Sequence, residues 1–383
     1  MSNNSLKSSE WQQPRWNCNN ELMETVDILK KLPPIVNFDD ITILYNALEK
    51  VWRREAVIFQ AGDCAERFKD SDEKNVVNKL ALLNELSSYF SLLVNKETVT
   101  VGRIAGQFAK PRSNIFEMVG SKKIPVWRGD NVNGFDQCGL ARIHDPKRLY
   151  KSYMISSSTI QYMKGFLGKN KKVWTSHEAL IIDYENNMIR SKTNKQDYLS
   201  STHWPWIGIR TLGPNSPHVD LLSKVYNPIS CKVSNNVSPQ YIKELCLMLN
   251  SSRKPGRLTF ISRFGCDKID QLEPLVIAAN ETKIPVLWMC DPMHGNTSIS
   301  PDGYKIRQTE DLISEVEHFC KILKKHDACN AGVHLEIKSG TIPECFGEGI
   351  FPTDADLKRI ECDPRLVEPQ IKSVLECWSK TAL

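Results

Sequence analysis

The sequence predicts an α/β protein built around a (β/α)8 TIM barrel, and three observations lead to this fold class. Short apolar runs alternate with helix-like stretches along most of the 383 residues. There are eight such runs, the number of strands in a parallel barrel of this kind. Each run ends in a polar or charged residue, as expected if the strand ends converge on one functional face. An open, doubly wound sheet would show the same alternation, so the number of runs favours the barrel without excluding the open sheet.

The predicted elements follow one another from residue 51 onward. Residues 1–50 contain Pro14, Pro33 and Pro34, which predicts an irregular N-terminal extension packed on a catalytic barrel spanning 51–383. The predicted strands are apolar runs followed by polar or glycine residues, at 56–60, 99–103, 173–175, 206–209, 229–233, 258–262, 286–289 and 332–335. The helical candidates between them include 73–93, 147–166, 239–249, 268–280 and 310–325.

Composition narrows the class of protein. With 41% hydrophobic and 25% charged residues, the chain can bury a full core. No run approaches the roughly 20 apolar residues that a membrane-spanning helix needs, and the polar residues 1–10 do not resemble a secretory signal. A net charge of +5 is too small and too scattered for a nucleic-acid-binding surface. We therefore expect a small-molecule partner and neither a nucleic-acid nor a membrane partner.

The cysteines indicate a reducing compartment. There are 12 of them, none in a Cys-x-x-Cys pair, and several lie inside apolar segments. This usage is typical of buried thiols and not of a disulfide scaffold or a structural zinc module. We therefore expect a cytoplasmic protein.

Four residues form a candidate metal site. Cys64, His294, Glu336 and Asp363 offer a thiolate, an imidazole and two carboxylates near the predicted strand ends. Such a mixed set suits manganese, iron, cobalt or zinc better than magnesium. Taken singly, each residue also has a structural interpretation: a small core cysteine, a loop histidine and two members of ion pairs.

Two groups of cations are candidate anion sites. Arg103, Arg210, Lys232 and Arg263 stand at or within a residue of strand ends, where a polyanionic ligand would pair them. The alternative is structural ion pairing with acids such as Asp63 and Glu178. The loop 102–113 ends in Lys110, Pro111, Arg112 and Ser113, which could hold a second phosphate or form a solvated basic loop. Neither a P-loop nor a Gly-x-Gly-x-x-Gly motif is present.

A series of segments, in order along the chain, resembles the type II (plant-like) 3-deoxy-D-arabino-heptulosonate 7-phosphate (DAHP) synthases. They include QAGDCAE (60–66), CDPMHGNT (290–297) and CDPRL (362–366), together with 101–113, 128–134, 174–179, 206–208, 227–228, 257–259 and 332–336. The resemblance implies a (β/α)8 barrel that condenses phosphoenolpyruvate with erythrose 4-phosphate. The products would be DAHP and phosphate, at the first step of the shikimate pathway, for aromatic amino acids or a secondary-metabolite pathway.

The resemblance also assigns roles to residues. It places a divalent metal, Mn²⁺, Co²⁺ or similar, on Cys64, His294, Glu336 and Asp363, and phosphoenolpyruvate on Arg103, Arg210, Lys232 and Arg263. The acceptor's phosphate would lie on Lys110, Pro111, Arg112 and Ser113, with Asn131 nearby. Cys64, Lys232 and His294 are the expected catalytic residues, with Glu178, His334 and a bound water as candidates for proton transfer. A homo-oligomer, dimer or tetramer, is expected.

Some positions depart from the family. Ile209 stands where a glutamate is usual, Ala61 and Ser234 replace glycines, and the segment 216–218 differs. These departures keep open a paralogue that uses another phosphorylated aldose. A non-catalytic partner of another shikimate enzyme is a further alternative, although the intact ligand set argues against it. The 44 residues between Asp130 and Thr175 leave little room for the regulatory helices of longer relatives, so we expect no inhibition by aromatic amino acids.

Overall fold

Eight parallel strands form the centre of the computed structural model, which describes residues 11–168, 172–192 and 196–382. In chain order the strands are β1 (Ala56–Gly62), β2 (Glu97–Arg103), β5 (Trp174–Thr175), β8 (Trp206–Ile207), β9 (Ile229–Val233), β10 (Leu258–Ser262), β11 (Val286–Cys290) and β14 (Cys329–Glu336). The sheet runs β5-β2-β1-β14-β11-β10-β9-β8. A parallel bridge between Glu178 and Trp206 joins its two ends. The predicted barrel is confirmed, and the predicted bounds of β9 and β10 match the structure.

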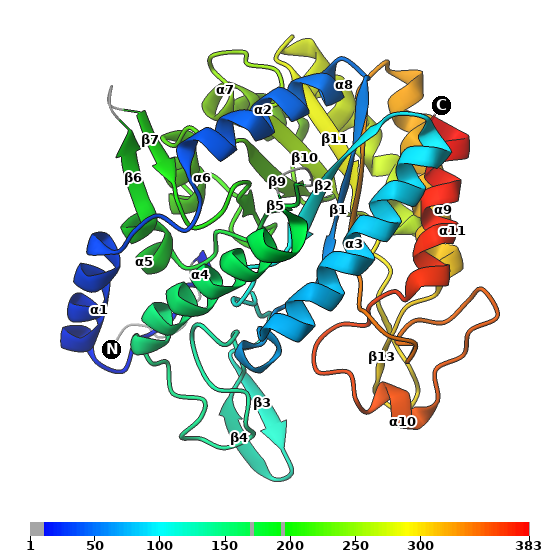
Figure 1. The fold of residues 1–383 in the computed structure, drawn as a ribbon. Helices are drawn as coiled ribbons and strands as arrows, with labels where there is room; N and C mark the ends of the chain where they lie inside the picture. The colour runs from blue at the N-terminus through cyan, green and yellow to red at the C-terminus, as the bar shows by residue number, and fades with distance from the viewer. Residues whose placement is uncertain (1–10, 169–171, 193–195, 383) are drawn as a thin grey trace, which may run out of the picture.

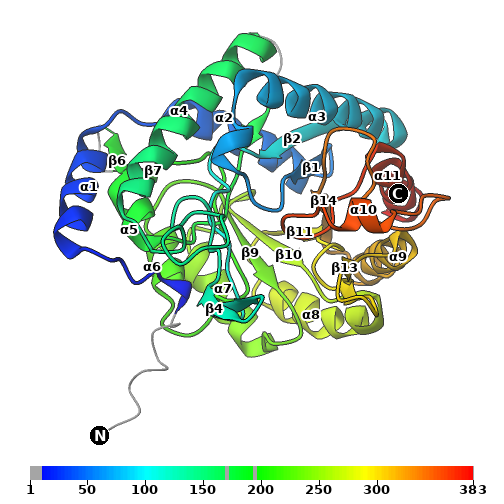
Figure 2. The ribbon, with the colours of Figure 1, turned by 90° about the horizontal axis from the view of Figure 1, so that it is seen from below.

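Helices surround the strands, as Figures 1 and 2 show. The longer ones after β1 are α3 (Glu73–Val94), α4 (Lys147–Leu167), α7 (Pro239–Leu249), α8 (Glu273–Glu281), α9 (Thr309–Lys325) and α11 (Glu368–Ala382). Shorter helices are η2 (Phe68–Asp70), α5 (Ile182–Glu185), η3 (Asn186–Met188), α6 (Pro217–Ser223) and α10 (Asp354–Leu357). Three antiparallel hairpins complete the fold: β3 (Phe116–Val119) with β4 (Lys122–Pro125), β6 (Ile189–Lys192) with β7 (Gln196–Leu199), and β12 (Ser298–Ile299) with β13 (Lys305–Ile306).

The predicted helix 268–280 is wrong in its first half. A 3-10 helix, η4 (Cys266–Leu272), precedes α8, and Pro274 occupies the first turn of α8. Proline has no backbone N–H and clashes with the preceding turn, so it is tolerated at the start of a helix but not in its interior. The α-helix therefore begins at Glu273.

The prediction that residues 1–50 are irregular is also wrong. Two helices, α1 (Asn19–Lys31) and α2 (Phe38–Trp52), fill most of this segment. The three prolines lie outside both helices, so they mark the ends of helices and not a lack of structure. The buried residues of α2 recur at helical spacing along one face: Ile41, Leu44, Tyr45, Leu48 and Val51.

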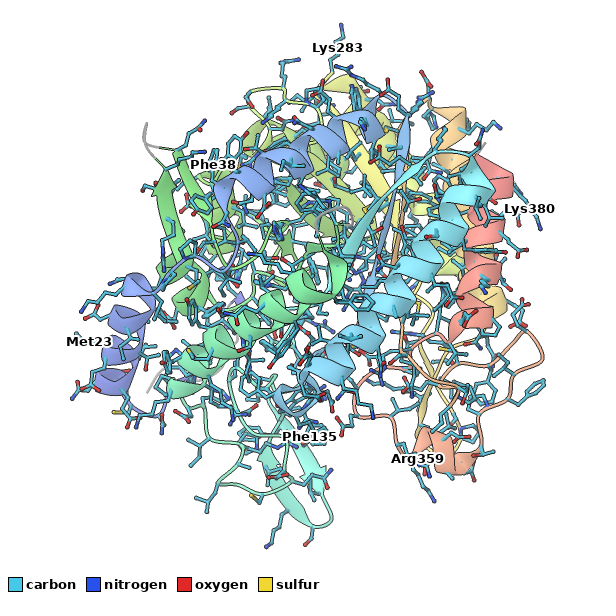
Figure 3. The ribbon with its side chains drawn as sticks, in the orientation of Figure 1. Met23, Phe38, Phe135, Lys283, Arg359 and Lys380 are labelled. Atoms are coloured by element: carbon cyan, nitrogen blue, oxygen red, sulfur yellow. The ribbon has the colours of Figure 1, made fainter. Side chains whose placement is uncertain are left out.

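Helix α2 closes one end of the barrel. Leu44, Leu48 and Val51 join inward-facing strand residues, including Ile58 and Met289, in one apolar cluster. The strands point away from this end, so their carboxyl ends open at the other. Figure 3 places Lys283 at the closed end and Phe135 and Arg359 at the open end, where the β3–β4 hairpin and α10 gather. No helix in the described part of the chain is long and apolar enough to cross a bilayer.

The Leu48→Ala variant is expected to lose about 2–5 kcal/mol of unfolding free energy, the cost of a cavity in a fully buried leucine site. Leu48 is completely buried, whereas Ile43 on the same helix is 42% exposed. Urea denaturation of Leu48→Ala and of the control variant Ile43→Ala checks this. An equal, small effect at the two positions would show that α2 does not contribute to the barrel core.

Candidate active site

A cavity of about 410 Å³ opens at the carboxyl ends of the strands. Its wall contains three of the four predicted metal ligands, namely Cys64, His294 and Asp363. It also contains all four predicted phosphoenolpyruvate cations and the loop Lys110, Pro111, Arg112 and Ser113. Glu336 lies fully buried behind this wall, in contact with His294. Residues that are up to 299 positions apart in the chain therefore share one cavity.

His294 is oriented by a buried carboxylate. Its Nδ1 lies 2.8 Å from Asp291 Oδ2, and its Nε2 lies 3.1 Å from Glu336 Oε1. Lys232 Nζ, 2.6 Å away, donates to the same Asp291 oxygen. Burial acts to raise the pKa of Asp291, but His294 and Lys232 outweigh it and hold the pKa well below its usual range. The ionised Asp291 can thus fix the imidazole with Nε2 toward the metal-ligand side, a common second-layer arrangement in metal sites.

Glu336 is held ionised by a buried arginine. Arg307 Nη1 donates to Glu336 Oε2 at 2.8 Å, and Arg307 Nε donates to Thr297 Oγ1 at 2.9 Å. Burial acts to raise the pKa of Glu336, yet His294, Arg307 and Arg103 together hold it well below the usual value. Glu336 can therefore offer a charged oxygen without a proton competing for it.

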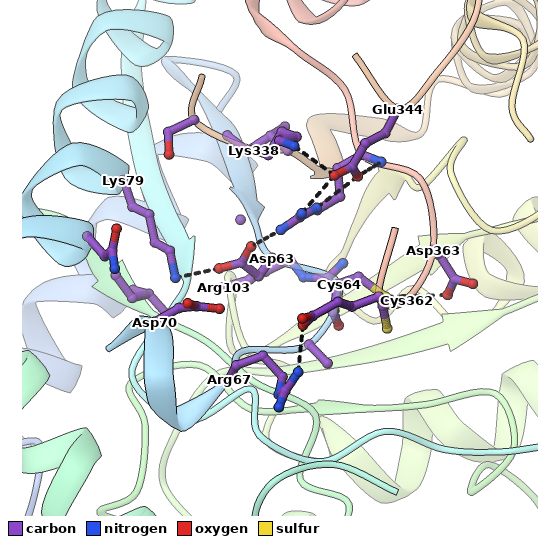
Figure 4. A pocket seen from close by; sticks show the side chains of 18 of the residues that line it. Asp63, Cys64, Arg67, Asp70, Lys79, Arg103, Lys338, Glu344, Cys362 and Asp363 are labelled. Carbon is purple, nitrogen blue, oxygen red and sulfur yellow. Dashed lines mark hydrogen bonds and ion pairs between the residues drawn. The ribbon is translucent and has the colours of Figure 1, made fainter. Parts of the chain in front are cut away.

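Two cysteine sulfurs lie near Asp363 and form a second group of donor atoms, beside the group of His294 and Glu336. Cys64 Sγ lies 3.2 Å from Cys362 Sγ and 3.3 Å from Asp363 Oδ2, and Figure 4 shows these three side chains together. Lys110 Nζ donates to all three, at 2.8, 2.6 and 2.7 Å respectively. Behind Cys64 and Asp363 lies a second cavity of about 270 Å³, into which Asp63 and Lys79 project.

The donor atoms suit a transition metal. Ligand atoms of His294, Glu336 and Asp363 lie within 4.8 Å of one another, as do those of Cys64, Cys362 and Asp363. The four predicted ligands thus fall into two groups that share Asp363. Imidazole, carboxylate and sulfur donors fit manganese, iron, cobalt or zinc, whereas magnesium prefers oxygen alone.

The four cations of the cavity differ in their pairing. Arg103 donates to Glu336 at 3.2 Å and Lys232 pairs with Asp291. Arg210 and Arg263 have no acidic partner within the described residues, and the Nε atoms of Arg103 and Arg263 are buried without a hydrogen bond there. Arg210 is exposed at the mouth of the cavity, whereas the two buried, unpaired Nε–H groups of Arg103 and Arg263 are costly to leave without an acceptor. An anionic ligand with several oxygens would satisfy them.

The predicted alternative, structural ion pairing with strand-end acids, holds for Arg103 and Lys232. It does not hold through the two acids named as examples, Asp63 and Glu178, nor for Arg210 and Arg263 in the described part of the chain. Asp63 instead pairs with Lys79 and Arg365, each at 2.6 Å. Glu178 Oε1 is buried without a hydrogen-bond partner in the described part of the chain. The two acids named as structural partners are thus engaged elsewhere or unpaired.

Glu178 is an acidic side chain of the cavity wall that makes no ion pair with the cations in the described structure. Burial raises its pKa, although Lys232 and Arg210 oppose the shift. Gly208 makes room for it, because a Cβ at that position would lie 2.0 Å from Glu178 Oε1. Ile209 also lines the cavity, so the position where the sequence resemblance implies a usual glutamate presents an apolar side chain here.

His334 forms a hydrogen bond with Arg103 inside the barrel. Its Nε2 lies 2.9 Å from Arg103 Nη1, and its Nδ1 lies 2.9 Å from Gln60 Oε1. Burial, followed by the charges of Lys232 and Arg103, holds the pKa of His334 well below its usual value. A neutral ring can accept a hydrogen bond from the guanidinium, so His334 fixes the position of Arg103.

The basic loop is anchored by its backbone. Lys110 N donates to Arg128 O at 2.9 Å. Gly129 has φ +103°, and a Cβ there would lie 2.0 Å from Phe108 O, so glycine permits this close approach. Arg210 Nη2 donates to Ser113 Oγ at 2.9 Å, which links the two predicted anion sites. Asn131 is buried beside the loop through its backbone bond to Phe108 and does not belong to the cavity wall.

Three functional positions were not predicted as such: Asp291, Arg307 and Cys362. Cys362 precedes Asp363 in the CDPRL segment, and Asp291 lies in the CDPMHGNT segment three residues before His294. Both could have been found from those motifs. Arg307 lies in no recognised segment, and its role depends on a contact with Glu336, 29 residues away.

The chain is similar to known proteins of one family. A family model described as the class-II DAHP synthetase family matches residues 1–171 and 168–375. A probable phospho-2-dehydro-3-deoxyheptonate aldolase from Pseudomonas fluorescens is 38% identical, over 97% of this chain and 95% of its own. A phospho-2-dehydro-3-deoxyheptonate aldolase from Streptomyces coelicolor is 32% identical, over 94% and 92%. The solved structure of such an aldolase from Francisella tularensis has a similar fold, with a TM-score of 0.58 and 16% identity over 93% of this chain and 96% of that one.

Proposed function

The chain belongs to the class-II DAHP synthetase family, and we propose that its cavity at the strand ends joins phosphoenolpyruvate to erythrose 4-phosphate. This is the reaction of DAHP synthase, the first step of the shikimate pathway. The observation that carries the assignment to this cavity is its composition. Donor atoms for a metal, four cations and a second basic loop all line one space of about 410 Å³.

The four cations would hold phosphoenolpyruvate. Arg263 and Arg103 offer unpaired Nε atoms, and Arg210 is free of acidic partners in the described structure. Guanidinium groups bind phosphate and carboxylate oxygens in pairs of hydrogen bonds, while Lys232 adds a point charge. Holding both anionic groups of the substrate fixes the orientation of its C3 carbon, which attacks the acceptor. Much of the rate enhancement then comes from positioning.

Arg112, Ser113 and Lys110 would bind the acceptor's phosphate. They line the same cavity, and Ser113 already contacts Arg210 of the first site. The acceptor's aldehyde carbon can therefore reach the donor's C3 while each phosphate stays on its own cations. Water then adds to C2 of the donor, and phosphate leaves.

The family is generally metal-dependent, and Cys64, His294, Glu336 and Asp363 would hold the ion, with Cys362 adjacent. The chemistry that a divalent ion supplies at such a site is Lewis acidity toward the acceptor's aldehyde oxygen. Asp291 and Arg307 hold His294 and Glu336 in place for that task. Manganese and cobalt are the proposed ions.

We also propose a cytoplasmic location and a homo-oligomer, a dimer or tetramer. All 12 cysteines are free thiols, which suits a reducing compartment and keeps Cys64 available. The oligomer rests on the family resemblance alone, and light scattering of the purified protein measures its size.

An acceptor panel tests the proposed function. The metal-loaded protein is given phosphoenolpyruvate with erythrose 4-phosphate, arabinose 5-phosphate or ribose 5-phosphate, and loss of phosphoenolpyruvate is followed. Turnover with erythrose 4-phosphate at a kcat/KM at least about 10-fold above the others is expected. A preference for a longer aldose would instead connect the apolar Ile209 to a changed acceptor.

Phenylalanine, tyrosine and tryptophan, alone or mixed, are expected not to inhibit. Between β2 and β5 the described residues contain one hairpin and one long helix, α4, and no additional helical pair. Allosteric inhibition needs a distinct site whose ligand distinguishes two states. Inhibition curves at physiological concentrations check this, with inorganic phosphate as a positive control. A saturable loss of most activity would show a regulatory site elsewhere.

A further inference from the structure

We propose that Lys110 couples metal binding to acceptor binding, because its ammonium group occupies donor atoms of the metal site until an anion draws it toward the acceptor site. The inference rests on the proposed function, since it takes Cys64 and Asp363 as metal ligands. It adds a feature that the set of metal ligands alone does not imply, because the metal site and the acceptor-phosphate site share one lysine.

The contacts of Lys110 place its charge among the donor atoms. Nζ lies 2.8 Å from Cys64 Sγ, 2.6 Å from Cys362 Sγ and 2.7 Å from Asp363 Oδ2. The three acceptors are the atoms that form one of the two candidate metal groups. The Lys110 side chain is only 10% exposed, so it belongs to the cluster and not to the solvent.

Asp363 has both oxygens engaged by lysines. Lys110 pairs with Oδ2 at 2.7 Å, and Lys305 pairs with Oδ1 at 2.5 Å. A divalent cation that uses Asp363 and Cys64 would therefore meet an ammonium group in contact with the same ligand atoms. Two cations so close repel each other strongly in a buried site. Metal binding is expected to displace the Lys110 ammonium.

The direction of that displacement follows from the loop. The Lys110 backbone is anchored by its bond to Arg128 O, so rotation about the side-chain bonds is the simplest way for the ammonium to move. It lines the 410 Å³ cavity with Arg112 and Ser113, which supply the other groups of the acceptor-phosphate site. A displaced Lys110 would add its charge to that site, and an anion there would in turn pull Lys110 away from the metal ligands.

This arrangement predicts reciprocal coupling, because an effector that raises metal affinity must have its own affinity raised by the same factor. The test follows Co²⁺ binding by the cobalt–thiolate absorption of the metal-stripped protein, so no turnover is needed. Sulfate serves as the phosphate-like probe because it leaves cobalt in solution, and chloride keeps the ionic strength constant.

In the wild type, sulfate is expected to raise Co²⁺ affinity at least about 5-fold, within the usual range of coupling between sites. The Lys110→Met variant is expected to bind Co²⁺ at least about 5-fold more tightly than the wild type without sulfate, and to show no response to sulfate. The Lys305→Met variant is the matched control. It removes a charge from the same carboxylate but not from the sulfurs, so it should keep the sulfate response.

The outcomes separate this inference from the proposed metal site. Cobalt binding that gives thiolate absorption but is indifferent to sulfate in the wild type would overturn the coupling and leave the metal site standing. Loss of the response in Lys305→Met as well as Lys110→Met would reduce the effect to general charge repulsion and also overturn it. An absence of any cobalt–thiolate signal in the wild type would overturn both proposals. The wild-type measurement does not depend on the folding of a variant.

Discussion

The His294→Ala variant is expected to lose at least about 100-fold in the rate of condensation and to bind metal weakly, while the barrel stays folded. His294 contacts Glu336 through Nε2 and Asp291 through Nδ1, so its removal takes away a proposed ligand and leaves both carboxylates without that contact. Even the loss of a residue that only orients a ligand typically costs 10- to 100-fold in metal affinity or activity. Metal analysis and turnover of the purified variant measure both effects.

The matched control is His318→Ala, which removes an exposed histidine of α9 whose one side-chain hydrogen bond within the described residues is to the Ser314 carbonyl of its own helix. It should leave metal content and turnover unchanged. Circular dichroism of both variants should match the wild type, because His294 is at the rim of the cavity with 22% of its side chain exposed. Full metal occupancy with normal turnover in His294→Ala would remove His294 from the ligand set.

The Arg263→Ala variant is expected to raise the KM for phosphoenolpyruvate at least about 10-fold and to lower kcat. A hydrogen bond to a charged group contributes about 1.5–3 kcal/mol. Arg263 is held by a single bond to the His294 carbonyl, and its Nε is unpaired among the described residues, so much of its bonding capacity is available to substrate. Arg263→Lys keeps the positive charge but loses the two-pronged guanidinium, so its KM for phosphoenolpyruvate should fall between those of the wild type and Arg263→Ala.

Steady-state kinetics with each substrate varied in turn provide the measurement for Arg263. The KM for the acceptor should change less than the KM for phosphoenolpyruvate. Arg53→Ala, at the end of α2, is the control because its side chain is 60% exposed and pairs with Glu49. If Arg263→Ala behaved like that control, Arg263 would have only a structural role.

The barrel could be predicted because each of its strands has a recognisable local sequence pattern. The strands β9 and β10 are fully buried and mostly apolar, and their predicted bounds match those of the structure. The strand predicted at 206–209 shrinks to Trp206–Ile207. Helix α2 was missed although its buried residues, such as Leu44 and Leu48, are spaced at helical period. The prolines near it mark only its boundaries and do not indicate irregular structure.

The candidate site could be predicted only where residues lie in recognisable segments. Cys64 and His294 lie in such segments, and the structure places both on one cavity. Arg307 could not be found because its role arises from a buried ion pair with Glu336 that only the closed barrel creates. The contact of Lys110 with Cys362 spans 252 positions and has no local signal. Long-range ion pairs of this kind are determined by tertiary packing and not by local pattern.

The most direct test of the account is metal-dependent product formation by the wild-type protein. The protein is stripped with a chelator, dialysed and supplied with phosphoenolpyruvate and erythrose 4-phosphate, and DAHP and phosphate are both quantified before and after addition of Mn²⁺ or Co²⁺. The account predicts no product before the metal and equal amounts of DAHP and phosphate after it. Undiminished condensation by the stripped protein, or phosphate release without DAHP, would contradict it.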